Sequence, residues 1–213
     1  MPPSPPLLIA THNPGKAREI AALLSGCGHA TVHLGERGIH DAYEETGTTY
    51  EANAVAKARH YAALSGLVAI ADDSGIEVEA LGGRPGVRSA RYGGEGLDDA
   101  GRNRLLMEEL RQAPAERRDA RYVAVAAIAR PDGVIRTFTG VCAGRIAAAP
   151  AGNGGFGYDP LFFHPALGVT FAEMPPADKQ RVSHRGLAFR AMAAFLGSDQ
   201  GREFLAGAAA TRR

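Results

Sequence analysis

Residues 44–92 read EETGTTYEANAVAKARHYAALSGLVAIADDSGIEVEALGGRPGVRSARY, and most of the predicted architecture follows from them. Within this stretch, the apolar run Leu67–Ala71 predicts a strand buried on both faces, because no polar residue alternates along it. The run ends at two adjacent acids, Asp72 and Asp73. Ligands of open α/β sheets lie beyond the carboxyl ends of the strands, and this position favours a functional use of the two acids.

Asp72 and Asp73 have two interpretations. Asp, Ser and Gly are common turn residues, so Asp72–Gly75 alone favours a solvated turn followed by a separate strand at Ile76–Ala80. A buried carboxylate without a partner is strongly unfavourable, so burial of the acids would require a metal ion or a cationic partner. The segments on either side of the acids decide between the two, and they favour the functional interpretation.

A helix is predicted before the strand. Thr48 or Thr49 can cap a helix that runs to about Ser65, and Glu51 can complete a capping box at its start. This structural use of Glu51 leaves Glu45, in the polar loop before the helix, available for other chemistry.

Leu7–Thr11 predicts a first strand, and the residues after it predict the start of a helix. Asn13 is a good N-cap, Pro14 suits the first helical position, and Lys16 follows in the first turn. Exposed backbone N–H groups, the positive end of the helix dipole and a lysine together form an anion site suited to phosphate. The Walker A spacing is absent. A plain capped helix with a solvated lysine is the alternative.

Lysine is scarce in this chain. Of 24 basic residues, three are lysine, Lys16, Lys57 and Lys179. Because the chain otherwise uses arginine, each lysine is a candidate for a position that needs a compact point charge. Lys57 shares a helix face with Asn53, four residues before it, and can reach an anion or the acids from there. The alternative for Lys57 is a solvated surface charge.

Residues 150–165 read PAGNGGFGYDPLFFHP and form a glycine-rich loop with aromatic side chains. Phe156 and Tyr158 suit a flat aromatic ligand, because rings stack on a base while glycines let the backbone approach it. The alternative is a turn that leads into an apolar core strand. We assign the first part of the loop to a ligand, and Phe162 and Phe163 to the core.

The remaining segments predict a mixed β-sheet flanked by helices, arranged as two lobes. They are a strand at Thr31–Leu34, a helix at Asp98–Arg111, a hairpin of Arg121–Arg130 and Val134–Gly140, a charged loop at residues 175–185, a helix at Gly186–Leu196 and a small, polar tail that is at most partly helical. The hairpin strands are expected to be antiparallel because Pro131-Asp132-Gly133 between them is a turn sequence.

Composition limits the function classes. The chain has 213 residues, of which 45% are hydrophobic, which is enough for a sizeable core. The net charge of +1 provides no electrostatic case for binding nucleic acid or a membrane. No apolar run reaches the length of about 18 residues that a membrane helix needs. Residues 1–6 predict a disordered lead-in and not a signal peptide.

Cysteine usage points to a reducing compartment. Cys27 and Cys142 are the two cysteines of the chain, and their spacing does not match a zinc site. A cytoplasmic location fits best, and a single disulfide stays possible.

The charged and aromatic groups together predict a nucleoside triphosphate site without a P-loop. Oxygen ligands from Glu45, Asp72 and Asp73 suit Mg²⁺ better than zinc. The three lysines suit the phosphates, and the aromatic glycine-rich loop suits a base.

The chain resembles the inosine triphosphate pyrophosphatase family of Ham1/RdgB-type enzymes, from Leu7 to about Leu196. The matching segments follow one another in the family's order and are highly specific together. They are Thr11-x-Asn13-x-x-Lys16, Glu45-Thr46-Gly47, Glu51-x-Asn53-Ala54, Lys57-Ala58-Arg59, Ala71-Asp72-Asp73-Ser74-Gly75, Pro85-Gly86-Val87, Ser89-Ala90-Arg91-Tyr92, Gly155-Phe156-Gly157-Tyr158-Asp159-Pro160 and Ser183-His184-Arg185. His12 stands where a smaller residue is expected.

The resemblance implies an elongated mixed α/β fold, formed by residues 7–213 as a single domain with two lobes and a central active-site cleft. It implies a homodimer and a Mg²⁺-dependent hydrolase that cleaves ITP, dITP and XTP between the α- and β-phosphates. The products would be the monophosphate and pyrophosphate, and the role would be to remove deaminated purines from the nucleotide pool.

The resemblance also implies roles for individual residues. Asp73 would be the general base, and Glu45 and Asp73 would hold the metal, with Asp72 as a further ligand. His184 and Arg185 would donate to the 6-oxo group of the purine, which explains rejection of ATP but not of GTP. The implied substrate-binding residues are Thr11, His12, Asn13, Pro14, Gly15, Lys16, Lys57, Ser74, Phe156, Gly157, Tyr158, Asp159, Lys179, His184 and Arg185.

Two other functions stay open at this point. The chain could hydrolyse another modified nucleotide, and turnover of that nucleotide above ITP would reveal it. It could also be a non-catalytic nucleotide-binding module, although the intact acids argue against a module.

Overall fold

The structure is a computed structural model that describes residues 5–94, 96–114 and 117–210. Residues 1–4 of the predicted lead-in lie outside this range. In chain order, the elements are β1 (Leu7–Ile9), α1 (Pro14–Leu24), β2 (Thr31–His33), a 3-10 helix η1 (Gly35–Arg37), α2 (Tyr50–Ser65), β3 (Ala69–Val78), η2 (Glu79–Leu81), η3 (Gly86–Arg91), α3 (Asp99–Glu109), β4 (Asp119–Ala129), β5 (Ile135–Ile146), β6 (Phe162–His164), β7 (Val169–Thr170), α4 (Pro176–Val182), α5 (His184–Gly197) and α6 (Asp199–Ala210).

The strands form a seven-stranded mixed sheet in the order β2-β1-β3-β4-β5-β6-β7. β1 pairs in parallel with β2 and β3, whereas β6 pairs antiparallel with β5 and β7. The predicted mixed α/β fold is therefore confirmed. None of the described helices is long and apolar enough to cross a membrane.

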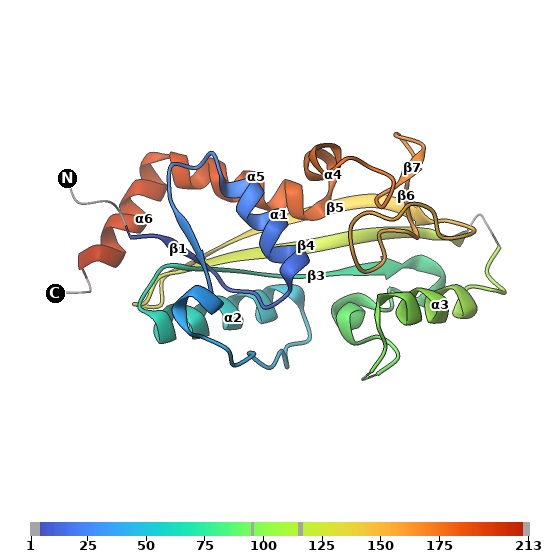
Figure 1. The fold of residues 1–213 in the computed structure, drawn as a ribbon, viewed down its shortest axis with the longest axis horizontal. Helices are drawn as coiled ribbons and strands as arrows, with labels where there is room; N and C mark the ends of the chain where they lie inside the picture. Colours follow the sequence, from blue (N-terminus) through green and yellow to red (C-terminus); the bar gives the residue numbers. More distant parts are fainter. Residues whose placement is uncertain (1–4, 95, 115–116, 211–213) are drawn as a thin grey trace. The chain divides into compact units, whose positions relative to one another are not determined.

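The chain divides into two compact units. Among the described residues, unit 1 comprises residues 5–73, 124–140 and 185–210, and unit 2 comprises residues 74–94, 96–114, 117–123 and 141–184. The long strands β3, β4 and β5 contribute residues to both units. In unit 1, α5 and α6 lie on one face of the sheet and α2 lies on the other face (Figure 1).

Each unit has its own apolar core. In unit 1, β1 and β3 pack with α1, α5 and α6, through buried side chains that include Ile20, Ile70 and Phe189. In unit 2, the rings of Tyr122 and Phe162 lie 4.7 Å apart, and both belong to a cluster that α3 joins through its leucines. Full burial of one such side chain stabilises a fold by about 1.5–3 kcal/mol.

The predicted caps at Asn13 and at Thr48 or Thr49 are confirmed, and the structure adds a cap at Asp98. Asn13 caps α1, Thr49 caps α2 and Asp98 caps α3, each through a side-chain oxygen that accepts a backbone N–H. The hairpin between β4 and β5 is also present, and its turn is closed by the Arg130 N–H, which donates to the Val134 carbonyl at 2.9 Å.

The strand does not end at Ala71 as expected, and the alternative of a solvated turn at Asp72–Gly75 is wrong. These residues lie inside β3, one continuous strand that includes both acids and the segment predicted as a separate strand. Asp72 is fully buried and Asp73 is 4% exposed. Cationic and amide partners for the two carboxylates allow the strand to continue through them, because a paired carboxylate can be buried without the penalty of an isolated one.

Two segments are more helical than the sequence predicts. The predicted charged loop at residues 175–185 contains α4, which begins with Pro176 at its first position. The predicted partly helical tail forms the twelve-residue helix α6, whose Phe204 and Ala208 complete the core of unit 1. The segment does carry local helix signals, because alanine favours a helix and the Ser198 hydroxyl accepts the Gly201 N–H at its start, and tertiary packing of Phe204 adds to them.

Both cysteines are free. Cys142 is buried in the core of unit 2, and Cys27 is half-buried beside the core of unit 1. The disulfide that the sequence left possible is therefore not formed.

Candidate functional site

Asp72 lies at the centre of a buried group of charges in unit 1. Its Oδ2 is 3.2 Å from the Nζ of Lys16, and the Nε and Nη2 of Arg185 each donate to the same oxygen at 3.2 Å. The Nη1 of Arg185 donates to Glu19 at 2.6 Å. Burial would raise the pKa of Asp72, but the charges of Lys16 and Arg185 outweigh it and hold this pKa far below its usual range. Asp72 is therefore a permanent anion with two cationic partners.

Glu19 and the Arg185–Asp72 contact are features that sequence reasoning missed. Glu19 lies on α1, one turn after Lys16, so a single helix supplies both a cation and an anion to this group. Together, Asp72 and Glu19 raise the pKa of Arg185, which burial alone would lower. The predicted contact of Arg185 with a purine stays a prediction.

Asp73 has a different environment from its neighbour. The Nδ2 of Asn53 donates to its Oδ2 at 2.8 Å, and the Oδ1 of Asn53 accepts the Gly47 N–H at 2.7 Å. Burial raises the pKa of Asp73, and the nearby charge of Glu45 raises it further against the effect of Lys16. A neutral amide thus orients this carboxylate, and its proton affinity is higher than usual.

Lys57 and Glu45 form an ion pair. Lys57 is 8% exposed, so the alternative of a solvated surface charge is wrong. Burial lowers the pKa of Lys57, but Glu45 and the two aspartates raise it by more, so the side chain is charged. This pair brings the loop that carries Glu45 to the face of α2 that also carries Asn53.

The start of α1 has the predicted capped geometry, and its use as an anion site stays a prediction. The Lys16 N–H donates to Asn13 Oδ1 at 3.0 Å, and the Asn13 N–H donates to Thr11 Oγ1 at 3.1 Å. Pro14 occupies the first helical turn. Burial lowers the pKa of Lys16, so an arriving anion would restore the stability of its charged form.

His12 connects this turn to the loop that carries Glu45. Its Nε2 is 3.1 Å from the carbonyl oxygen of Asp41, and the Tyr61 hydroxyl donates to the same oxygen at 3.0 Å. The Tyr43 N–H in turn donates to the Tyr61 hydroxyl. A long ring at position 12 therefore has a structural use that a smaller residue could not serve.

The three acids do not form a ready-made metal site. Among the described residues, no three His, Cys, Asp or Glu side chains form a group that could hold a metal ion. Asp72 already faces two cations. Magnesium is commonly held by one or two carboxylates together with substrate phosphates and water, and Glu45 and Asp73, which are close enough to influence each other's charge, fit that smaller donor set.

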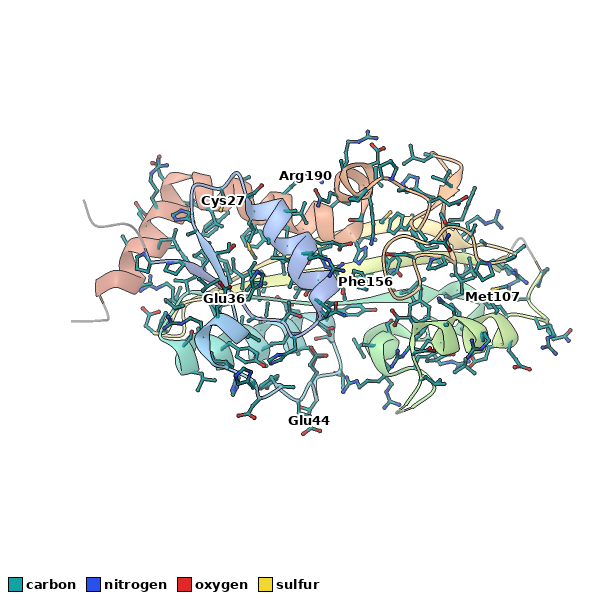
Figure 2. The ribbon with its side chains drawn as sticks, in the orientation of Figure 1. Cys27, Glu36, Glu44, Met107, Phe156 and Arg190 are labelled. Carbon is teal, nitrogen blue, oxygen red and sulfur yellow. The ribbon has the colours of Figure 1, made fainter. Side chains whose placement is uncertain are left out.

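The aromatic glycine-rich loop of unit 2 is held together by Asp159. Its Oδ2 accepts from the Lys179 Nζ at 2.5 Å and from the Phe156 N–H at 2.9 Å. The Lys179 ammonium also lies 5.0 Å from the centroid of the Phe156 ring, a cation–π contact. The structure therefore brings Phe156, Asp159 and Lys179 together, a grouping that the sequence did not predict, and the expected contact of Lys179 with phosphates stays a prediction; Figure 2 labels Phe156 in this loop.

Tyr158 and His184 are buried side chains in unit 2. Tyr158 is 4% exposed and its hydroxyl donates to the Ser89 carbonyl at 2.9 Å, so it serves the core, and its position does not support the predicted stacking on a base. Burial raises the pKa of Tyr158, which keeps the hydroxyl protonated as a donor. His184 stacks on Tyr122 at 4.4 Å, and its contact with a purine stays a prediction.

Gly155→Ala is expected to disrupt the loop. A Cβ at Gly155 would lie 2.0 Å from Asp159 Oδ2, at a φ of +71° that side chains rarely adopt. We expect a loss of about 2–4 kcal/mol of unfolding free energy, measured by urea denaturation, because strain and clash add.

Gly168→Ala is the matched control, because Gly168 has a φ of +70° and open space around its Cβ position. It should cost about 1 kcal/mol, as strain alone predicts. Equal losses in the two variants would show that the contact with Asp159 does not constrain the loop.

The mixed sheet, the capped start of α1 with Lys16 and the buried acids describe an α/β protein in which two adjacent carboxylates have distinct environments. The chain belongs to the Ham1 family, whose family model matches residues 7–195. The family resemblance in the sequence motifs is therefore confirmed.

Known relatives extend over most of the chain. A protein of Thermus thermophilus named dITP/XTP pyrophosphatase is 49% identical over 87% of this chain and 89% of its own length. A protein of Desulforamulus reducens with the same name is 47% identical over 86% of this chain and 92% of its own length. The solved structure of a Ham1 protein from Coxiella burnetii is 38% identical, covers 89% of this chain and 97% of its own, and matches with a TM-score of 0.81.

Proposed function

We propose that this chain is a hydrolase of dITP, XTP and ITP that releases pyrophosphate and the nucleoside monophosphate. The observation that carries the proposal is the activity for which its relatives are named, dITP/XTP pyrophosphatase, at 43–49% identity over 86–90% of the chain. The removal of deaminated purines from the nucleotide pool is the corresponding role.

The phosphates would bind to the start of α1. Lys16 and the backbone N–H groups of the first turn supply positive charge at a fixed position, and Lys57 adds a further cation from α2. Asp72 is proposed to keep Lys16 and Arg185 in place and not to bind metal, because its Oδ2 is already surrounded by their donors.

Glu45 and Asp73 would hold the magnesium ion together with phosphate oxygens. When bound, the ion would neutralise phosphate charge and orient the α-phosphate for attack. Glu45 would have to exchange part of its contact with Lys57 for the ion, and the arriving phosphates offer Lys57 a replacement anion.

Asp73 is proposed as the general base. It would accept a proton from a water molecule whose oxygen forms a bond to the α-phosphorus, while the bond from that phosphorus to the bridging oxygen breaks. The leaving group is pyrophosphate and the proton stays on the carboxylate. Two features of Asp73 support this role, its elevated pKa and its orientation by Asn53, since a base acts best when its pKa approaches the working pH.

Base recognition is proposed for the loop that carries Phe156. The Phe156 ring offers a face for a purine, and Lys179 and Asp159 offer a donor and an acceptor. We further propose a homodimer in the cytoplasm that binds neither nucleic acid nor membrane. The near-neutral net charge and the two free cysteines support this setting.

A substrate panel tests the proposed function. ATP, GTP, ITP, dITP and XTP are incubated with the protein and Mg²⁺, and pyrophosphate and orthophosphate are measured separately. We expect pyrophosphate from dITP, ITP and XTP, at least roughly 10-fold less turnover of ATP and GTP, and loss of turnover in EDTA that Mg²⁺ restores.

Three results would contradict the proposal. Orthophosphate as the sole primary product would place the cleavage elsewhere, and ATP as the best substrate would refute the purine preference. Binding of ITP without release of pyrophosphate would indicate a nucleotide-binding module.

A further inference from the structure

Helix α3 holds both backbone polar groups of one glycine, Gly157, in the loop that carries Phe156. The Gly157 N–H donates to Asp99 Oδ2 at 2.7 Å, and the Gly157 carbonyl accepts from Asn103 Nδ2 at 3.0 Å. Asp99 and Asn103 are four residues apart on α3, so they lie on one face of the helix and reach the two peptide groups that flank the Cα of Gly157. Both polar groups of this glycine therefore have a side-chain partner.

Gly157 is the point at which the loop most needs such support. It adopts a φ of +63°, and a glycine backbone rotates with little resistance because it has no Cβ. The neighbours of Gly157 are anchored independently, with the Phe156 N–H on Asp159 and the Tyr158 hydroxyl on Ser89. Rotation about Gly157 would move the Phe156 ring relative to the buried Tyr158, so the two contacts from α3 restrict that movement.

Asn103 is buried at a cost that packing alone does not explain. It is 8% exposed, and its Oδ1 is buried without a hydrogen-bond partner among the described residues. An apolar side chain would fill this place without desolvating an amide. Burial of a polar atom that stays without a hydrogen bond costs about 1–3 kcal/mol. In return, the amide contributes the hydrogen bond from its Nδ2 to the Gly157 carbonyl.

Asp99 is held in place by contacts at the start of α3. Asp98 caps α3, which fixes the first turn of the helix, and the Nη1 of Arg102 is 3.4 Å from Asp99 Oδ1. The other carboxylate oxygen accepts from Gly157. A charged acceptor forms a stronger hydrogen bond to a backbone N–H than a neutral one does.

We propose that Asp99 and Asn103 are positioning residues for purine recognition, acting through the backbone of Gly157 to hold the Phe156 ring where a base can stack on it. The inference rests on the proposed function and adds to it a second set of residues, on a helix that carries none of the predicted site residues. Neither side chain is proposed to touch the nucleotide.

The test uses steady-state kinetics of the full chain with dITP and GTP, together with the melting temperature. Asn103→Asp is nearly isosteric and removes the donor. We expect it to raise the KM for dITP roughly 10-fold, as loss of one hydrogen bond between a loop and its support predicts, while kcat changes less than about threefold. The preference for dITP over GTP should fall as well.

Asp99→Ala and Asp99→Asn separate positioning from general stability. Asp99 is 53% exposed in its side chain, so Asp99→Ala is expected to fold and to raise the KM for dITP by roughly fivefold. Asp99→Asn keeps an acceptor oxygen and should stay within about twofold of the unaltered chain. Arg104→Ala, at an exposed position of the same helix, is the control and should change neither constant.

A double-mutant cycle provides the sharpest outcome. Because Asp99 and Asn103 hold the backbone of the same residue, Gly157, the KM of the double variant Asp99→Ala/Asn103→Asp should be lower than the product of the two single effects predicts. Independent effects, an unchanged KM, or a fall in kcat with unchanged KM would overturn the positioning role. Failure of the proposed function is distinguishable, because the unaltered chain would then release no pyrophosphate from dITP.

Discussion

Asp73→Asn is expected to lower kcat for dITP roughly 10³-fold while the protein keeps its fold, because an amide cannot accept the proton that a general base removes from water. The amide oxygen can still accept from Asn53, so the local geometry has a replacement for the 2.8 Å hydrogen bond. Burial raises the pKa of Asp73, so loss of its charge removes a desolvation penalty and the melting temperature should not fall.

The measurement is pyrophosphate release by the purified variant, alongside its thermal unfolding curve. Asp199→Asn is the control, because Asp199 is 89% exposed in its side chain at the start of α6 and should leave both quantities unchanged. If Asp73→Asn keeps more than about a tenth of the activity, a general base elsewhere is required.

Asp72→Asn is expected to have the opposite profile and to destabilise the fold by about 3–5 kcal/mol. The substitution removes one negative charge and leaves Lys16 and Arg185 without their common partner in a buried position. A buried cation without a counter-charge is far less stable than a buried pair. The side chain of Arg185 is 3% exposed, so water cannot replace the lost partner without a local opening.

Urea unfolding measures this loss as a shift of the transition midpoint at constant slope. The second variant Asp72→Asn/Lys16→Met removes one of the two stranded cations, and it should recover part of the lost stability. A loss below about 1 kcal/mol for Asp72→Asn would show that the cations find other partners and that Asp72 is not the centre of the charge group.

Asp73→Asn and Asp72→Asn therefore separate an effect on catalysis from an effect on stability. Asp72 and Asp73 alternate along β3, so their side chains point to opposite faces of the strand. One carboxylate meets Lys16 and Arg185, and the other meets the amide of Asn53. For this reason, the carboxyl groups of two adjacent residues in a strand can have different pKa values.

Local sequence was sufficient for the features that depend on a few consecutive residues. The caps at Asn13 and Thr49, the position of Lys16 in a first helical turn, and the hairpin after β4 all follow from short-range rules. A cap needs one side-chain oxygen near three backbone N–H groups, and this arrangement is encoded within one turn of the chain.

Tertiary packing decided the features that the sequence predicts poorly. Residues 72–75 have a turn composition, but the cations beside Asp72 permit one strand to pass through them. At these residues the deciding energy comes from contacts with distant segments, and this energy outweighs local preference. The last helix α6 differs, because its alanines favour a helix and Ser198 caps its start, so its local sequence contains signals that sequence reasoning missed.

The sequence by itself determined that this chain has two adjacent acids after an apolar run, a phosphate-type helix start and an aromatic glycine-rich loop. It also determined that any buried acid would need a cation, because that requirement follows from the free energy of burying charge. Only the tertiary structure decided which cation serves which acid. Asp72 and Arg185 are 113 residues apart in sequence, and the fold that brings the start of α5 to β3 selects this pair.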